Sequence, residues 1–523
     1  MRVRLLGSAA LGAALLAGCS QGGSYSAGPV STEAYADPAA MPPEMRERYA
    51  RNDISPVRNV AEAPVSTFAV DVDTAAYSNV RRFLVGGATP PRDAVRTEEM
   101  INYFRYDYPL PADRGAPFSV TTDVSTTPWN PQTRLLRVGL RGYDLNYRER
   151  PAANLVFLVD VSGSMDQPDK LPLVKAALAT LADGLRPQDR VSIVVYAGAA
   201  GLVLAPTSDR LQIKAALDNL NAGGSTAGGE GIQLAYATAR ANRIEGGINR
   251  VILATDGDFN VGLSDQRGLE ELIERNRDDG ITLTALGFGR DNLNDAMMEA
   301  IADKGNGNYA YIDTAMEARK VLDEQLGSTL FTIAGDVKVQ VEFDPAAVSQ
   351  YRLIGYENRA LREEDFKNDQ VDAGEIGAGH QVTAIYEIVP TGAQGWSGPR
   401  RYAGNQPAAA PAQSGSGEMA FVKLRYKLPG EKQSRLIERP VPRALIAGAA
   451  APQGDMAFAV AVAGFAQKLR GDTLLGSWSY ADIRRLAGSP ADYWRREFVE
   501  LVGIAESGRF AAEADGLPEN AAL

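Results

Sequence analysis

Short apolar runs alternate with helix-length amphipathic segments through the middle of the chain. Residues 155–159 and 251–255 are two such runs, and each meets polar residues at its end. Runs that are apolar on both faces are typical of buried parallel strands, while the segments between them repeat apolar positions at helical spacing. The alternation predicts an α/β domain over residues 151–331, with a doubly wound, mostly parallel sheet and right-handed crossovers.

The individual elements of this domain follow from the same pattern. We expect strands over residues 155–159, 191–196, 202–206, 251–255, 281–288 and 309–312. We expect helices over residues 170–185, 210–220, 231–241, 266–277, 293–303 and 315–326. Ligand sites in such sheets lie at the carboxyl ends of the strands, so the residues that follow each strand are the first candidates for function.

Outside this domain the hydrophobic period changes to two. Residues 337–343 alternate strictly between apolar and polar, which is typical of a half-buried antiparallel strand. Similar stretches lie at 118–125 and 134–140 before the α/β domain, and at 381–389 and 420–426 after it. Our hypothesis is that these strands form one β-sandwich into which the α/β domain is inserted. The alternative is two separate β units.

The pattern divides the chain into six segments. These are a leader at 1–19, a flexible tether at 20–65, an N-terminal α+β region at 66–150, the α/β domain at 151–331, a β-sandwich region at 332–445 and a C-terminal helical module at 446–523. Ordered structure is expected to begin at Ser66 with a short strand, followed by helices at 77–85 and 96–103. Asp71 and Asp73 lie in the turn between them, and we expect their carboxylates to cap the first helix.

Oxygen-bearing side chains follow two of the predicted strands and one further loop. Asp160, Ser162 and Ser164 come directly after the first strand, and Asp256 ends the run at 251–255. Thr226 lies in a glycine-rich loop between these strands. Hard oxygen donors from three loops at one edge of a sheet predict a divalent-cation site. The alternative interpretation is that the first three residues only cap the next helix.

The five positions resemble the metal-ion-dependent adhesion site of von Willebrand factor type A (VWA) domains. That motif runs Asp-x-Ser-x-Ser, then a Thr, then an Asp, and all five positions are filled here in order. The resemblance implies Mg²⁺, or alternatively Mn²⁺ or Ca²⁺, bound by the hydroxyls directly and by the aspartates directly or through water. It also implies that a partner protein supplies an Asp or Glu to an open position on the ion.

The N-terminus resembles the signal peptide and lipobox of bacterial lipoproteins. Two arginines precede the apolar stretch at 5–16, and Leu-Ala-Gly-Cys follows, ending at Cys19. Cys19 is the only cysteine, so no intramolecular disulfide is possible, and the resemblance implies that Cys19 is lipidated. Ser20 follows it, which resembles outer-membrane sorting where a cell has two membranes. No later run reaches the roughly 18 to 20 apolar residues that a transmembrane helix needs.

The modules on both sides of the predicted VWA domain complete a resemblance to bacterial VWA-domain lipoproteins with associated N-terminal and C-terminal modules. The net charge of -11 argues against nucleic acid as a partner, since nucleic-acid binding needs a basic footprint. The only histidine, His380, lies far in sequence from the serine loop, and the Gly-x-Ser-x-Gly elbow, the Walker loop and Cys/His clusters are missing from the sequence. We therefore expect a protein that is not an enzyme and that has no small-molecule substrate.

Two functions are consistent with these features. The first is an envelope lipoprotein that binds a protein partner through the metal ion. The alternative is a structural or assembly lipoprotein in which the metal chiefly stabilises the VWA fold. For both, the two aspartates are expected to repel each other in the metal-free protein, so that replacing either by alanine does not lower its melting temperature.

Overall fold

The computed structural model describes residues 47–146, 149–225, 228–257, 266–325, 328, 330–397 and 417–508. Contacts between residues group 43–523 into one compact unit and 1–42 into another, and every described residue belongs to the former. Cys19 therefore lies outside the described residues, as does Thr226. Among the helices that are described, none is both long enough and apolar enough to cross a bilayer.

The central domain is built on a six-stranded sheet with the order β10-β9-β8-β5-β6-β7. Neighbouring strands are parallel except for the β6–β7 pair, which is antiparallel. The prediction of a doubly wound, mostly parallel sheet is thus confirmed. The strands are β5 (Ala153–Asp160), β6 (Arg190–Tyr196), β7 (Ala200–Thr207), β8 (Ile248–Thr255), β9 (Thr282–Phe288) and β10 (Tyr309–Ile312).

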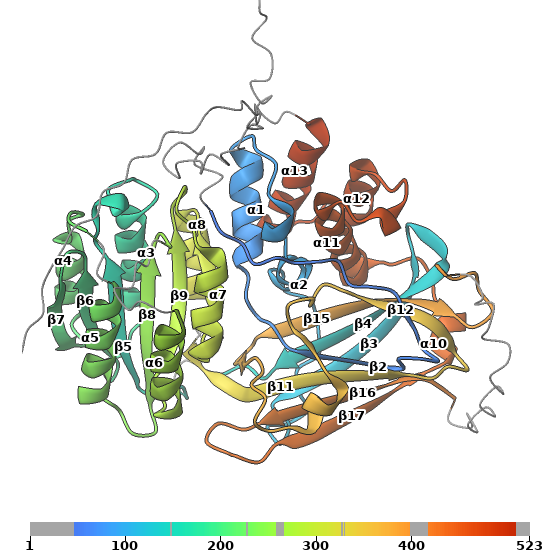
Figure 1. The fold of residues 1–523 in the computed structure, drawn as a ribbon, viewed down its shortest axis with the longest axis horizontal. Coiled ribbons are helices and arrows are strands. Elements are labelled where there is room, and N and C mark those ends of the chain that lie inside the picture. Colours follow the sequence, from blue (N-terminus) through green and yellow to red (C-terminus); the bar gives the residue numbers. More distant parts are fainter. Residues whose placement is uncertain are drawn as a thin grey trace, which may run out of the picture. The chain divides into compact units, whose positions relative to one another are not determined.

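Helices connect these strands and cover the sheet on both faces (Figure 1). They are α3 (Leu171–Asp183), α4 (Arg210–Asp218), α5 (Gly228–Ala241), α6 (Gln266–Asp278), α7 (Asp295–Lys304) and α8 (Ala315–Arg319). The sequence predicted each of them within a few residues. The last one differs in kind, because after Arg319 the chain winds into a π-helical turn at Lys320–Glu324 instead of a continued α-helix.

Two antiparallel sheets form the β framework outside the α/β domain. One has the order β1-β12-β15-β4-β3 and the other β13-β2-β11-β16-β17, with β14 paired to β11. Each sheet combines strands from before and after the α/β domain, as the β4–β15 and β2–β11 pairs demonstrate. Phe343 lies between the sheets with its ring centroid 5.4 Å from that of Tyr386. The hypothesis of one shared sandwich is therefore confirmed.

Several framework strands were not predicted from the sequence. The strands before the insertion are β1 (Arg58–Asn59), β2 (Val65–Ala69), β3 (Phe118–Thr127) and β4 (Asn130–Gly142). Those after it are β11 (Thr332–Phe343), β12 (Val348–Ile354), β13 (Ala360–Leu361), β14 (Ile376–Gly377), β15 (Gln381–Pro390), β16 (Glu418–Lys427) and β17 (Arg435–Pro442). The strands that the sequence did not predict are β1, β12, β13, β14 and β17. Of these, β1, β13 and β14 have two residues each and are too short for a periodic pattern. Strand β17 is almost wholly exposed, so neither of its faces carries an apolar stripe.

Ordered structure begins earlier than the predicted Ser66. The Glu47 carboxylate accepts a hydrogen bond of 2.8 Å from Arg82, and its side chain is only 1% exposed. The backbone N–H of Arg48 donates to the carbonyl of Leu293, 2.9 Å away in the α/β domain. Polar contacts with distant segments fix these residues, and such contacts leave no hydrophobic period in the sequence.

A helical layer completes the fold. It combines α1 (Ala75–Val85) and α2 (Thr97–Asn102) with α11 (Gly454–Arg470), α12 (Tyr480–Ala487) and α13 (Tyr493–Ser507), while the short α10 (Ala444–Ala447) packs against the β framework. Short 3₁₀ turns lie at Arg92–Ala94, Gly163–Met165, Glu363–Lys367 and Thr473–Leu475. The rings of Phe104, Phe458 and Phe498 pack edge to face between α2, α11 and α13. Trp478 belongs to this packing, since its side chain is only 8% exposed.

Candidate metal centre

The first group of predicted site residues lies where β5 ends. All eight residues of β5 are buried, and Asp160 is the last of them. The backbone N–H of Ser162 donates to Asp160 Oδ1 over 2.9 Å, which turns the chain out of the sheet. Hydroxyl Oγ atoms of Ser162 and Ser164 then lie 3.1 Å apart. One carboxylate and two hydroxyls are thus gathered at the carboxyl end of the central strand.

The alternative interpretation, in which these residues only cap a helix, is wrong. Ser162 precedes a three-residue 3₁₀ turn and makes no side-chain capping bond to it. The next α-helix, α3, starts at Leu171, and its N-cap residue Lys170 also makes no side-chain capping bond. Since no helix end uses the serine hydroxyls, their arrangement beside Asp160 needs a different explanation.

Asp160 lies in a fully buried, hydrogen-bonded position. Its Oδ2 accepts hydrogen bonds of 3.0 Å from the Tyr196 hydroxyl on β6 and of 3.0 Å from the Thr255 hydroxyl on β8. Burial raises the pKa of Asp160 to about 6, and the nearby Asp256 carboxylate acts in the same direction. Thr255 directly precedes Asp256 and β8 pairs with β5, so the two predicted aspartates lie at the ends of neighbouring strands.

Asp256 has an unexpected neighbour. Lys170 Nζ donates to Asp256 Oδ2 over 2.9 Å, and the two side chains are only 1% and 0% exposed. The expected repulsion between the aspartates stays a prediction, and the rise in the pKa of Asp160 caused by Asp256 agrees with it, but the Lys170 ammonium compensates one of the two charges. A lysine at the start of a helix is usually exposed, so no pattern in the sequence predicts that Lys170 is buried here.

The loop that leads to Thr226 is fastened to the serine loop. The N–H of Gly223 donates to the carbonyl of Val161 over 2.8 Å, and the N–H of Gly163 donates to the carbonyl of Gly224 over 3.1 Å. Gly224 has a φ of 86°, which only glycine adopts readily. The described part of this loop ends at Ser225, so the chain is held beside the serines up to the residue before Thr226.

These residues fit a hard divalent cation. Neighbouring oxygens around an octahedral Mg²⁺ ion lie about 2.9 Å apart, since each Mg–O bond is about 2.0–2.1 Å. The 3.1 Å between the two serine hydroxyls matches that spacing without rearrangement. Ser162 is buried and Ser164 is half-buried, so one side of the group opens to solvent. The ion would supply positive charge at this opening, where an external anion can reach it.

Comparison with known proteins places this domain in a family. A family model described as "von Willebrand factor type A domain" matches residues 154–325, and one described as "Uncharacterized protein YfbK, C-terminal" matches residues 328–507. A third, described as "von Willebrand factor", matches residues 43–137. The Escherichia coli protein YfbK is 45% identical over 471 residues, which cover 88% of this chain and 81% of its own. This chain belongs to the YfbK family.

Other similar proteins match a smaller share of the chain. A Synechocystis protein, sll0103, is 34% identical over 188 residues, which cover 35% of this chain and 43% of its own. Among solved structures, BatB from Bacteroides thetaiotaomicron is 26% identical and covers 34% of this chain and 97% of its own, with a TM-score of 0.30. The YfbK-family chain is thus a bacterial VWA-domain protein with a C-terminal YfbK module, and its VWA domain indicates a role in protein interaction or adhesion.

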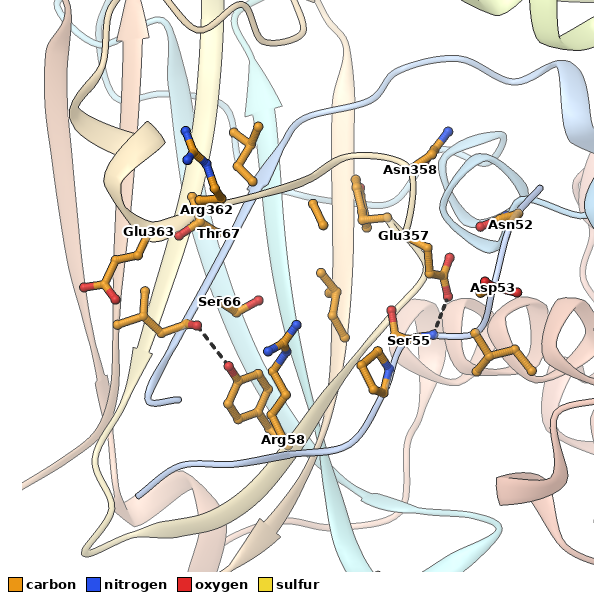
Figure 2. A pocket seen from close by; sticks show the side chains of 18 of the residues that line it. Asn52, Asp53, Ser55, Arg58, Ser66, Thr67, Glu357, Asn358, Arg362 and Glu363 are labelled. Atoms are coloured by element: carbon orange, nitrogen blue, oxygen red, sulfur yellow. Dashed lines mark hydrogen bonds between the residues drawn. The ribbon is translucent and has the colours of Figure 1, made fainter. Parts of the chain in front are cut away.

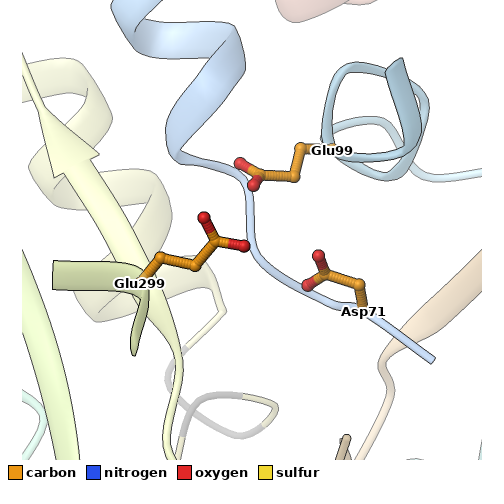
Figure 3. A group of neighbouring side chains, drawn as sticks. All are labelled: Asp71, Glu99 and Glu299. Carbon is orange, nitrogen blue, oxygen red and sulfur yellow. The ribbon is translucent and has the colours of Figure 1, made fainter. Parts of the chain in front are cut away.

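A second acidic group lies where the VWA domain meets the flanking modules. The carboxylates of Asp71, Glu99 on α2 and Glu299 on α7 point toward one another (Figure 3), with one oxygen of each within 4.8 Å of the others. Arg359 Nε is 3.0 Å from Asp71 and its Nη2 is 3.1 Å from Glu299, while Arg96 pairs with Glu99. Two guanidinium groups supply the positive charge here, so the triad is an ion-pair junction.

The predicted capping role of Asp71 and Asp73 is also wrong. The N-cap residue of α1, Thr74, makes no side-chain capping bond, and the N–H of Ala76 in the first turn donates to Glu99. Asp71 Oδ1 accepts from the N–H of Asp73, whose own Oδ1 accepts a 2.8 Å hydrogen bond from the N–H of Tyr309 on β10. The two carboxylates therefore join the framework to the VWA domain, and their partners are too distant in sequence for a local pattern to reveal them.

A third guanidinium connects three modules at the end of the VWA domain. Arg81 on α1 donates over 2.8 Å to Asp313, which follows β10, and over 2.8 Å to Glu317 on α8. Its Nη1 donates over 2.9 Å to Glu497 on α13. Only 5% of the Arg81 side chain is exposed. The last helix of the VWA domain is thus held by both the N-terminal and the C-terminal module.

One cavity lies entirely within the framework. It has a volume of about 660 Å³ and lies between residues 51–58 and residues 351–363 (Figure 2). Two hydrogen bonds line it, from Tyr351 to the Val65 carbonyl at 3.0 Å and from the Ser55 N–H to Glu357 at 3.1 Å. None of the described metal-site residues lines this cavity, so it is separate from the metal centre.

His380 lies in the turn before β15 and is half-buried. Its Nδ1 accepts a hydrogen bond of 3.1 Å from the N–H of Gly377. Burial lowers the pKa of His380 to about 3, with Arg105 and Arg250 acting in the same direction. The imidazole is therefore neutral and is engaged in holding its own turn.

Proposed function

We propose that this YfbK-family chain is a lipid-anchored protein of the bacterial cell envelope that binds a protein partner through a Mg²⁺-type ion. The ion is held by Asp160, Ser162, Ser164, Thr226 and Asp256. The partner contributes a carboxylate to the open side of the ion. The chain has no catalytic role in this proposal, since the metal serves to capture a ligand and not to activate water.

The observation that carries the proposal is the grouping of carboxylate and hydroxyl oxygens at the carboxyl ends of β5 and β8. Three of the five donors are neutral hydroxyls, so only the two aspartates offset the charge of the ion. A divalent cation with an exposed coordination position still accepts an anionic oxygen ligand at short range. Salt screens the repulsion between the acidic chain and an acidic partner beyond about 8 Å, so capture depends on the local field of the ion.

Membrane attachment rests on Cys19 and the leader before it, which lie outside the described residues. Diacylglycerol and acyl chains on Cys19 would anchor the chain far more firmly than a single acyl chain. In a cell with two membranes, Ser20 favours the outer one. Residues 20–46 would then connect the lipid to the first described residue, Glu47.

A second function is favoured by the ion-pair junctions. Arg81, Arg96 and Arg359 bind the VWA domain to both flanking modules through buried carboxylates. Because these ion pairs hold the VWA domain against both modules, they favour a structural or assembly lipoprotein in which the metal chiefly stabilises the VWA fold. The two functions differ in what removal of the metal does to the fold.

Affinity capture from envelope extracts separates them. The full chain is used as bait in Mg²⁺ and in chelator, with circular dichroism of the bait recorded in both. Metal-mediated capture predicts that partner binding disappears in chelator while the spectrum stays native, because Lys170 already compensates Asp256. Loss of native structure on chelation supports the structural function instead.

Site variants test the assignment of the ligands. Asp160→Ala is expected to lose Mg²⁺ binding because it removes a charged ligand, and Thr226→Ala to keep a weakened metal site with poor partner binding. Ser164→Ala removes one hydroxyl from the open side and is expected to reduce capture. Ser208→Ala, at an exposed serine before α4, is the matched control. Wild-type Mg²⁺ affinity in Asp160→Ala would contradict the proposed site.

A further inference from the structure

The buried Lys170–Asp256 pair gives the proposed metal site an internal positive charge. The Lys170 ammonium and the Asp256 carboxylate are 2.9 Å apart with 1% and 0% of their side chains exposed. A charge so deeply buried is tolerated only with a partner, and removing one member of a buried pair is strongly destabilising. Lys170 therefore stabilises the position of Asp256 whenever no metal ion is present.

The lysine side chain is held in this position by the backbone beside it. A Cβ atom at Gly289 would lie 2.4 Å from Lys170 Cγ and 2.5 Å from its Cε, so the stem lies directly against this glycine. The carbonyl of Gly289 accepts a 2.6 Å hydrogen bond from the Tyr311 hydroxyl, which fixes the strand end. Lys170 itself begins α3, and its carbonyl accepts from the N–H of Val174. The ammonium is a fixed part of the site.

This charge changes the electrostatics of metal binding. Two carboxylates would neutralise a divalent ion completely, and the hydroxyls of Ser162 and Ser164 add no charge. With Lys170 present, the same site carries one excess positive charge once the ion is bound. The ammonium and the ion also compete for the charge of Asp256, since both are attracted to the same carboxylate.

We propose that Lys170 is an internal counter-ion that replaces the divalent cation at Asp256 in the metal-free protein, lowers the affinity of the site for metal alone, and couples metal binding to capture of a carboxylate. This inference deepens the proposed function and rests on it. The excess positive charge favours an anionic ligand on the bound ion, so the ion and the carboxylate bind with positive cooperativity. Full occupancy then requires the partner.

The test compares charge-removing variants of the purified full chain. Lys170→Met removes the ammonium, and Lys170→Gln keeps a hydrogen-bond donor without the charge, which guards against a folding failure of the first. Lys175→Met is the matched control, because Lys175 lies on the same helix and its ammonium donates to the carbonyl of Asp218. Mn²⁺ is titrated calorimetrically into each protein, with chloride or acetate as the only anion at equal ionic strength.

We expect both Lys170 variants to bind Mn²⁺ about tenfold tighter or more in chloride than the wild type, since a like charge near the ion is removed. Acetate should strengthen Mn²⁺ binding to the wild type and to Lys175→Met, and should do so less in the Lys170 variants. In chelator, Lys170→Met should melt below the wild type, and Mn²⁺ should reverse the difference.

The failure of this inference differs from the failure of the proposed function. Equal Mn²⁺ affinity in wild type and both Lys170 variants overturns the counter-ion role while leaving the metal site intact. Mn²⁺ binding by none of the proteins overturns the proposed metal site itself. Unchanged melting of Lys170→Met in chelator also overturns the counter-ion role, because the carboxylate of Asp256 would then not depend on the ammonium.

Discussion

Replacement of Arg81 by methionine should destabilise the junction between the VWA domain and the flanking modules. Methionine fills much of the same volume but leaves the carboxylates of Asp313, Glu317 and Glu497 without their guanidinium. The side chains of these acids are 8%, 1% and 19% exposed, so water replaces little of the lost interaction. Breaking a buried ion pair by removal of one partner costs about 3–5 kcal/mol.

The pH dependence gives this prediction a second, independent measure. Burial raises the pKa of Asp313 and of Glu497, and Arg81 opposes that rise in both. Without Arg81 the folded-state pKa values rise further above the unfolded values of about 4. A raised carboxyl pKa contributes stability below the unfolded pKa that is lost as pH rises through the folded pKa. The defect of Arg81→Met should therefore be larger at pH 7.5 than at pH 5.

Urea denaturation followed by tryptophan fluorescence at both pH values measures the free energy of unfolding. Arg485→Met is the control, because Arg485 pairs with Asp482 while 75% of its side chain is exposed. Exposed pairs contribute about 0–1 kcal/mol, so this variant should stay close to the wild type. A loss below about 1 kcal/mol for Arg81→Met at pH 7.5, or an equal loss at both pH values, would refute the reasoning.

Three further changes test other parts of the structure. Burial raises the pKa of Glu98 to about 7. The stability that this group contributes is therefore lost as pH rises from about 4.3 through 7. Glu98→Gln should melt at a higher temperature than the wild type at pH 8 but not at pH 5. Gly464→Ala places a Cβ 2.0 Å from Trp478 and should cost about 1–3 kcal/mol, while Gly503→Ala, with nothing within 4 Å, should not destabilise; equal melting of the two would contradict this. Cys19→Ala should abolish metabolic labelling with a fatty acid, and persistent label would exclude lipidation at this residue.

The VWA domain was the most predictable part of the fold because its signal is local. Apolar runs such as residues 155–159 and 309–312 contain their own strand pattern, and the observed strands start or end within a few residues of them. The π-helical turn at Lys320–Glu324 was missed because its cause is distant. The Lys320 ammonium donates to the carbonyl of Tyr103, 2.9 Å away in the N-terminal module, and local helix propensity contains no trace of that contact.

The metal-site prediction was limited in the same way. The spacing of Asp160, Ser162 and Ser164 was enough to predict their grouping, since they follow one strand by a few residues. Asp256 was placed near them by the rule that parallel strands end at one edge. The burial of Lys170 was not predicted, because the sequence around a buried lysine does not differ from that around an exposed one. Its burial follows from the backbone of Gly289, which lies against the lysine side chain.

The charge arrangement of the VWA domain shows why its properties depend on the whole chain. Its carboxylates at Asp295, Glu299 and Asp313 find their guanidinium partners in the flanking modules, on α1, before α2 and after β12. A fragment limited to residues 150–330 would leave these acids without their guanidinium partners. Metal binding measured on such a fragment would mix the affinity of the site with the folding of its support. The same acids are paired with guanidinium groups only in the full chain, so the full chain is the form in which the proposed metal binding should be measured.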